Sequence, residues 1–127
     1  MRTRPSSVVF VARTHWVVGI VIVGTIALFR YVTRDLPYLE FGPRTYAITG
    51  ALGALYLLTG TLVWLGAPLG RLLSRICGLL YLARPQFGSY VWDTMSLPEF
   101  KEHFYRAARG RSKIQAPRSR EEPNSND

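Results

Sequence analysis

The chain has 127 residues with one cysteine, and its 16 lysine and arginine residues against 8 aspartate and glutamate residues give a net charge of +8. This length limits it to one small domain, and a single cysteine excludes a disulfide within the chain. Charges are absent from residues 14–29 and from residues 45–70, whereas residues 111–127 have almost no apolar side chains. Such segregation is typical of a small integral membrane protein, and it argues against a self-contained enzyme.

The first apolar segment, residues 14–33, is predicted to form transmembrane helix 1 after a basic N-terminal segment, residues 1–13. Its uncharged stretch is short, but Arg13 and Arg30 can snorkel, so a helix over the segment can cross the bilayer. No small-x-small cleavage pattern follows the segment, and we therefore expect an uncleaved anchor helix rather than a signal peptide.

The second apolar segment, residues 45–67, is predicted to form transmembrane helix 2. Its uncharged core, residues 45–65, would be roughly 31 Å long as a helix, which matches the hydrocarbon thickness of a bilayer. Tyr46 and Trp64 lie near its ends, where amphipathic rings favour the interface. The alternative, a buried core helix, would need more surrounding chain than this sequence provides.

Small residues recur at three- and four-residue spacing in the second span, and such a face allows close helix approach. The predicted helix-packing residues are Ala47, Gly50, Ala51, Gly53, Ala54 and Gly60. Either the first span or a helix of another protein could pack on this face. The alternative explanation is the general abundance of glycine and alanine in membrane helices.

Charge asymmetry predicts the topology of this helical hairpin. The N-terminal segment carries three basic residues, whereas the chain from Arg71 onward carries ten; the connecting loop, residues 34–44, carries three that are partly offset by Asp35 and Glu40. The positive-inside bias therefore places both termini in the cytoplasm and the loop outside. The loop's apolar residues, Tyr38, Leu39 and Phe41, are expected to lie against the membrane surface or a partner. The excess of arginine over lysine suggests a bacterial source, and hence the inner membrane.

Residues 69–84 are predicted to form an amphipathic helix in the cytoplasmic interface, after a break at residues 66–70. Its leucines cluster on one side, and Arg71, Arg75 and Arg84 are expected to contact lipid head groups or an acidic partner. A third crossing would have only about eight uncharged residues, too few to span. A straight continuation of the second helix is the other alternative.

Residues 85–110 are predicted to hold a cytoplasmic aromatic segment followed by a short helix. Ser96 is the expected N-cap of that helix and Gly110 its C-terminal stop, with Glu102 and Arg106 paired on its surface. Exposed aromatic side chains need a cover from the membrane or a partner. The predicted docking residues are Phe87, Tyr90, Trp92, Phe100 and Phe104. Residues 111–127 are predicted to be a disordered tail.

The sequence contains few groups that could carry chemistry. His15 has no facing histidine at similar depth for a haem, and His103 with Glu99 lacks a third metal ligand. Cys77 has no companion cysteine, and neither span carries an internal charge of the kind that ion-coupled transporters keep. We therefore expect no catalytic residue, no metal site and no cofactor.

These observations predict an all-α membrane protein: a two-helix hairpin, an interfacial helix, a short amphipathic helix and a tail. The leading hypothesis is a non-catalytic accessory or assembly subunit of a larger bacterial inner-membrane complex. Its expected partners are the membrane, anionic lipid and other membrane subunits, because the basic residues lie beside the spans; nucleic acid is not expected. The alternatives are a small homo-oligomeric channel or transporter, and a membrane-tethered adaptor that acts through its basic tail.

Overall fold

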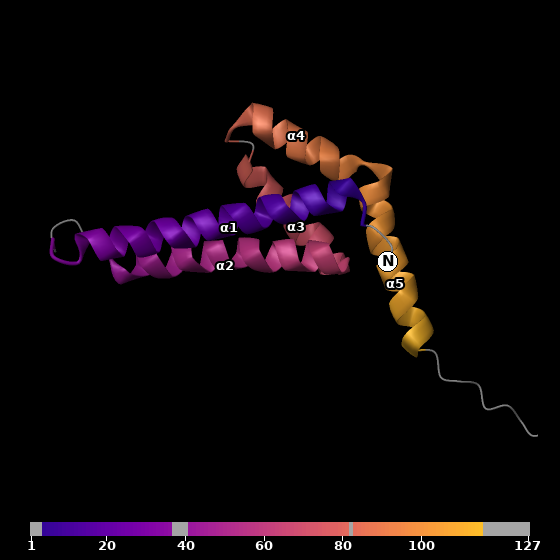
Figure 1. Cartoon of the computed structure of the whole chain (residues 1–127), viewed down its shortest axis with the longest axis horizontal. Helices are drawn as coiled ribbons and strands as arrows, with labels where there is room; N and C mark the ends of the chain where they lie inside the picture. Colours follow the sequence, from indigo (N-terminus) through magenta and orange to yellow (C-terminus); the bar gives the residue numbers. More distant parts are fainter. Residues whose placement is uncertain (1–3, 37–40, 82, 116–127) are drawn as a thin grey trace, which may run out of the picture.

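The computed structural model describes residues 4–36, 41–81 and 83–115, and within these ranges it contains five α-helices and no strand (Figure 1). The helices are α1 (Ser6–Thr33), α2 (Pro43–Leu65), α3 (Pro68–Tyr81), α4 (Pro85–Ser96) and α5 (Pro98–Gln115). Each of the last four begins at a proline. The fixed φ of proline suits the first helical position, and the N–H group that proline lacks would have no acceptor within the helix there. The prediction of an all-helical chain is confirmed.

α1 and α2 form a long antiparallel hairpin, and both are long and apolar enough to cross a membrane (Figure 1). Both predicted apolar helices are therefore present. α1 begins earlier than predicted, at Ser6 rather than near residue 14, because the apolar run Val8–Val11 continues the helix toward the N-terminus.

Glycines let the two hairpin helices approach closely. A Cβ atom added at Gly60 would lie 2.6 Å from Cδ1 of Trp16 and 2.9 Å from the carbonyl oxygen of Ala12. At Gly53 it would lie 2.6 Å from Cγ2 of Val23. Any larger residue at these two positions would have to push the helices apart.

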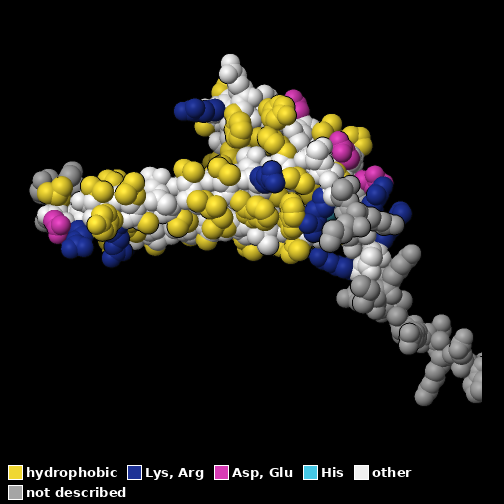
Figure 2. Space-filling view, viewed as in Figure 1, with side chains coloured by type: hydrophobic (Ala, Val, Ile, Leu, Met, Phe, Trp, Pro, Cys, Tyr) yellow, Lys and Arg dark blue, Asp and Glu magenta, His cyan; other side chains and the backbone are white. Residues whose placement is uncertain are grey.

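The other three helices wrap only one end of the hairpin (Figure 1). We call α3, α4 and α5 the cap. All buried residues of α1 except Thr33 lie at or before Gly19, and all those of α2 lie at or after Gly53. The remainder, which we call the bare half (residues 20–33 and 43–52), projects beyond the cap and is covered with apolar side chains (Figure 2).

A sharp turn separates α2 from α3. Gly66 adopts the left-handed conformation (φ 69°), and the N–H groups of Gly66 and Ala67 donate to the carbonyl oxygens of Val63 and Leu62. Glycine suits this position because other residues are strained there. The second span therefore does not continue straight into the next helix.

α3 turns its small and polar side toward the protein and its apolar side outward. The inward residues are Gly70, Ser74, Cys77, Gly78 and Tyr81. The outward residues are Leu69, Leu72, Ile76, Leu79 and Leu80, each between 51% and 57% exposed. A helix covering the core of a soluble protein has the opposite orientation.

The last two helices differ from the prediction. Residues 85–96 form a helix of their own, and Ser96 ends it by donating to the carbonyl oxygen of Trp92 instead of capping α5. α5 passes through Gly110, whose φ is not positive, and ends at Gln115. The predicted stop at Gly110 is therefore wrong, as is the predicted disorder of residues 111–115; residues 116–127 lie outside the described residues. The predicted pair of Glu102 and Arg106 is present, with 2.7 Å between Oε1 and Nη2.

Candidate functional site: a buried polar cluster

The most polar part of the interior centres on His15, whose side chain is completely buried where α1 meets α3. Its Nδ1 atom lies 2.6 Å from the hydroxyl oxygen of Tyr81, and its Nε2 atom lies 2.7 Å from Oγ of Ser74. Ser74 and Tyr81 stand two turns apart on the inward side of α3, so one helix supplies a partner for each ring nitrogen.

The surrounding hydrogen bonds select one tautomer of His15. The hydroxyl of Ser74 donates to Sδ of Met95 in α4 at 3.0 Å, so Ser74 accepts a hydrogen bond from Nε2–H. Nδ1 is then the acceptor for the Tyr81 hydroxyl, since a neutral imidazole has one donor and one acceptor. A single chain of donors therefore runs from Tyr81 through His15 and Ser74 to Met95.

A second set of polar groups from α2 lies beside this chain. The hydroxyl of Tyr56 donates to the carbonyl oxygen of Cys77 at 3.0 Å, and Oγ1 of Thr59 lies 3.7 Å from the Cys77 sulfur. Burial raises the pKa of the Cys77 thiol, although its contact with Thr59 opposes this. Burial likewise raises the pKa of the Tyr81 hydroxyl, and the neighbouring Tyr56 and Cys77 reinforce the effect.

We call these seven residues the polar cluster: His15, Tyr56, Thr59, Ser74, Cys77, Tyr81 and Met95. Each is buried, and the raised pKa keeps the thiol protonated at neutral pH, so it is a poor nucleophile. Within the described residues, no group of three or more His, Cys, Asp or Glu side chains is placed to hold a metal ion. The cluster is suited to fasten the cap to the hairpin by hydrogen bonds.

The sequence did not single out this cluster, although it contained a signal for it. Ser74, Cys77 and Tyr81 recur at three- and four-residue spacing on a helix whose other face is rich in leucine. Such spacing places polar groups on one side. The sequence could not show that His15 lies opposite them, because 59 residues separate His15 from Ser74.

The structure divides the predicted helix-packing residues into two groups. Gly53 and Gly60 face α1, whereas the three alanines lie on another side of α2, with Gly50 between the two sides. Ala47, Ala51 and Ala54 are exposed there, and a Cβ atom added at Gly50 would meet no atom within 4 Å. We call Ala47, Gly50, Ala51 and Ala54 the small-residue face.

The three arginines expected to contact lipid or an acidic partner differ in their surroundings. The guanidinium of Arg71 stands over the ring of Tyr105, 5.9 Å from its centroid, whereas Arg75 and Arg84 are exposed. The arginines are thus spread along α3 and the turn that follows it.

The five aromatic residues predicted to dock a partner also differ in their exposure. Phe100 and Phe104 are only 1% and 4% exposed, so the cover that they needed comes from this chain and they offer no free docking surface. Trp92 is half-buried and donates from Nε1 to the carbonyl oxygen of Gly78. Phe87 and Tyr90 stay exposed on α4. Of the predicted loop contacts, Tyr38 and Leu39 lie outside the described residues.

His103 occupies a separate site, where α5 meets the C-terminal end of α2. Its Nε2 atom is buried without a hydrogen-bond partner in the described structure, close to Gly66. Burial lowers the pKa of this histidine and the charge of Arg4 adds to that, while the nearby carbonyls of Val63 and Trp64 oppose it. His103 is 88 residues beyond His15, and the two histidines belong to different clusters.

The buried polar groups of the described chain thus serve mainly to join its helices. Its exposed groups are largely apolar or basic, and these are the surfaces left for interaction. Comparison with known proteins gives no family: no protein-family model, curated protein or solved structure matches this chain.

Proposed function

We propose that this protein is a non-catalytic, two-span membrane protein that serves as an accessory or assembly subunit of a larger complex in a bacterial inner membrane. The observation that carries the proposal is the division of its surface. Polar groups of the interior are used to hold the cap on the hairpin, whereas the bare half and the outer face of α3 present apolar side chains. Such a surface favours a protein that acts by contact with other components of the membrane.

Membrane placement is supported by the exposure of the bare half. Ile20, Leu28 and Ile48 are each more than 60% exposed, and they lie on helices of spanning length. Continuous apolar surface of this size is rare on soluble monomers, whereas a bilayer covers it without cost. The outward leucines of α3 add exposed apolar surface to the cap.

Orientation is supported by the distribution of charge. The cap and the start of α1 carry Arg4, Arg13, Arg71, Arg75, Arg84, Lys101, Arg106, Arg109 and Arg111. The opposite tip carries Arg30, Arg34 and Arg44, and Arg34 lies 3.6 Å from the carboxylate of Asp35. The positive-inside rule then places the capped end, with both termini, in the cytoplasm.

The accessory role is supported by the small-residue face. Its three alanines are exposed, and a Cβ atom added at Gly50 would meet no atom of the described chain within 4 Å. Exposed leucine and isoleucine are sufficient for contact with lipid, whereas small residues allow a second helix to approach closely. A helix of another membrane subunit is therefore the occupant that we propose.

A matched pair of substitutions tests this role. Ala54→Leu places a large side chain on the small-residue face, and Ala27→Leu makes the same change on the exposed surface of α1. Tagged variants would be purified in mild detergent, and the native high-mass band identified by mass spectrometry. We expect defined membrane subunits to co-migrate with the wild type and with Ala27→Leu, and to be lost from Ala54→Leu.

Two outcomes would contradict the proposal. Equal retention of the partners by both variants would show that the small-residue face does not take part in the interaction. A band that contains only copies of this chain would overturn the accessory role, and flux of ions or solutes through vesicles that contain only this protein would then establish a channel.

A further inference from the structure

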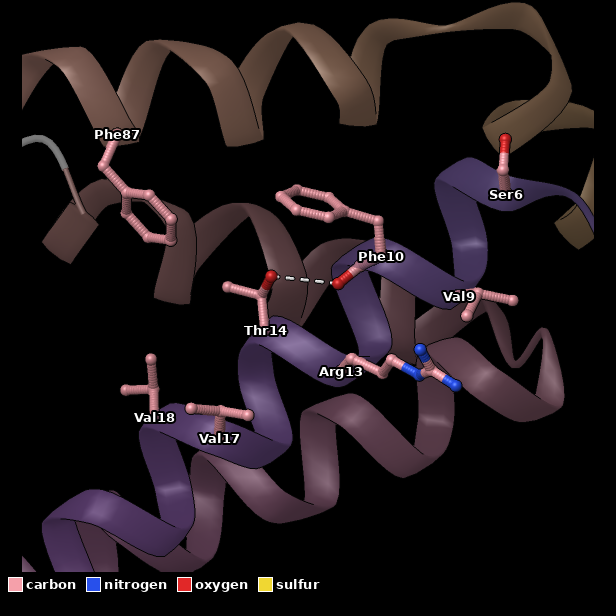
Figure 3. A pocket seen from close by; sticks show the side chains of 8 residues that line it. All are labelled: Ser6, Val9, Phe10, Arg13, Thr14, Val17, Val18 and Phe87. Atoms are coloured by element: carbon pink, nitrogen blue, oxygen red, sulfur yellow. Dashed lines mark hydrogen bonds between the residues drawn. The ribbon is translucent and has the colours of Figure 1, made fainter.

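We propose that the groove between α1 and α4 is a binding site for one anionic glycerophospholipid, with its phosphate at Arg13 and an acyl chain along the apolar wall (Figure 3). The groove has a cavity volume of about 590 Å³, within the range of small-molecule sites. The inference requires the proposed membrane placement, but it is independent of the accessory role.

The wall of the groove is apolar and comes from two helices. Phe87 extends from α4 toward α1 and Phe10 extends from α1 toward α4, with Val17 and Val18 about two turns beyond Phe10 along α1 (Figure 3). The hydroxyl of Thr14 donates to the carbonyl oxygen of Phe10 at 2.9 Å, so it adds no free donor to the wall. Such a surface accepts a hydrocarbon chain and offers little to a polar ligand.

Arg13 is the charged residue of the lining, and its charge is not balanced by the described part of the chain. The ion pairs described there join Arg34 with Asp35 and Arg106 with Glu102. Three other arginines, Arg4, Arg30 and Arg71, stand over aromatic rings, whereas no such contact is described for Arg13. A phosphate group would supply the missing anion through charge-assisted hydrogen bonds.

The order of these groups along α1 matches the polarity of a lipid. Arg13 immediately precedes the uncharged stretch, and Val17 follows one turn later, roughly 6 Å further along the axis. Beyond Val17, the exposed side chains of Ile20 and Val21 continue the apolar wall onto the bare half. A head group at Arg13 would thus lie on the cap side, and its acyl chain would run into the bilayer beside the hairpin.

Competitive lipid retention tests the head-group contact. Full-length protein in mild detergent would be incubated with equal amounts of phosphatidylglycerol and phosphatidylcholine of identical acyl chains, and bound lipids would be counted by native mass spectrometry. We expect one retained phosphatidylglycerol in the wild type. Arg13→Gln should lower the preference for phosphatidylglycerol about tenfold, the worth of one charge-assisted hydrogen bond. Arg13→Lys should keep most of it.

Two control variants separate this site from general lipid contact. Arg109→Gln removes the same charge from an exposed position on α5, outside the groove, and should leave the preference unchanged. Val17→Trp should fill the groove and abolish retention of both lipids, whereas Val21→Trp, one turn outside it, should not. Circular dichroism and size exclusion establish that each variant is folded.

The proposal is overturned if Arg13→Gln and Arg109→Gln reduce the preference equally, because the effect would then be one of net charge. It is also overturned if Val17→Trp retains lipid as Val21→Trp does, or if the wild type retains the two lipids in equal amounts. None of these readouts depends on a protein partner, so failure here and failure of the accessory role are distinguishable.

Discussion

The Nδ1 atom of His15 lies 2.6 Å from the hydroxyl oxygen of Tyr81, across 66 residues of sequence. Their rings are also stacked, with centroids 5.6 Å apart and planes inclined by 21°. This pair joins the first helix of the hairpin to the end of α3, and α3 also has polar contacts with α2 and α4. His15 and Tyr81 thus fix where the cap sits along the hairpin.

Tyr81→Phe should destabilise the protein, because it leaves Nδ1 of the buried His15 without a donor. The cost of one unpaired buried polar group is about 1–3 kcal/mol. The free energy of unfolding would be measured by titrating SDS into mixed micelles. Tyr90→Phe is the matched control, since Tyr90 is 61% exposed, and it should change the free energy little. Equal effects of the two substitutions would show that the His15 contact contributes nothing.

Gly60→Ala should weaken the hairpin, because the added methyl group would lie 2.9 Å from the main-chain oxygen of Ala12, which cannot move aside alone. We expect a loss of about 1–3 kcal/mol in the same titration. Gly50→Ala makes the same change in α2 where a Cβ atom meets nothing within 4 Å, and it should be neutral or stabilise by up to about 1 kcal/mol. A neutral Gly60→Ala would contradict the close approach of the helices.

Cys77 should resist thiol reagents in the folded protein, because its side chain is buried and burial raises its pKa. Labelling with a maleimide would be followed by mass spectrometry at neutral pH, before and after unfolding. As a control, Ile76→Cys in a Cys77→Ala background moves the thiol to the exposed neighbouring position, where labelling should be fast. Fast labelling of native Cys77 would be inconsistent with its place in the polar cluster.

His103 should make the docking of α5 dependent on pH. Its pKa is lowered in the folded protein, mainly by burial, so the folded state binds its proton less tightly than the unfolded state does. The free energy of unfolding is therefore highest above the unfolded pKa of about 6.5. It decreases as the pH falls from there toward the folded pKa. The charged residues that line the same cavity as this histidine are Arg4, Glu99, Glu102 and Arg106.

The measurement for His103 is the thermal unfolding midpoint between pH 7.5 and pH 5. The wild type should lose stability over this interval, and His103→Gln should lose less because it carries no titrating group there. If both proteins show the same dependence on pH, other groups cause it.

The sequence alone determined the helical class and the two long apolar helices. Both follow from runs of uncharged residues, and a helix satisfies its own backbone hydrogen bonds whatever surrounds it. It also placed the break after α2 at residues 66–70, because Gly66 and Pro68 restrict the backbone locally. The pair of Glu102 and Arg106 was predictable for the same reason, since its two members are one turn apart.

The tertiary structure decided everything that depends on residues distant in sequence. Only it could show that Phe100 and Phe104 are covered within the chain, that Gly53 and Gly60 face α1, and that the partners of His15 are Ser74 and Tyr81. Helical periodicity assigns a residue to one side of its helix, but it does not say which neighbour lies on that side. That neighbour is set by the angles between helices, and these angles depend on the packing of many side chains at once.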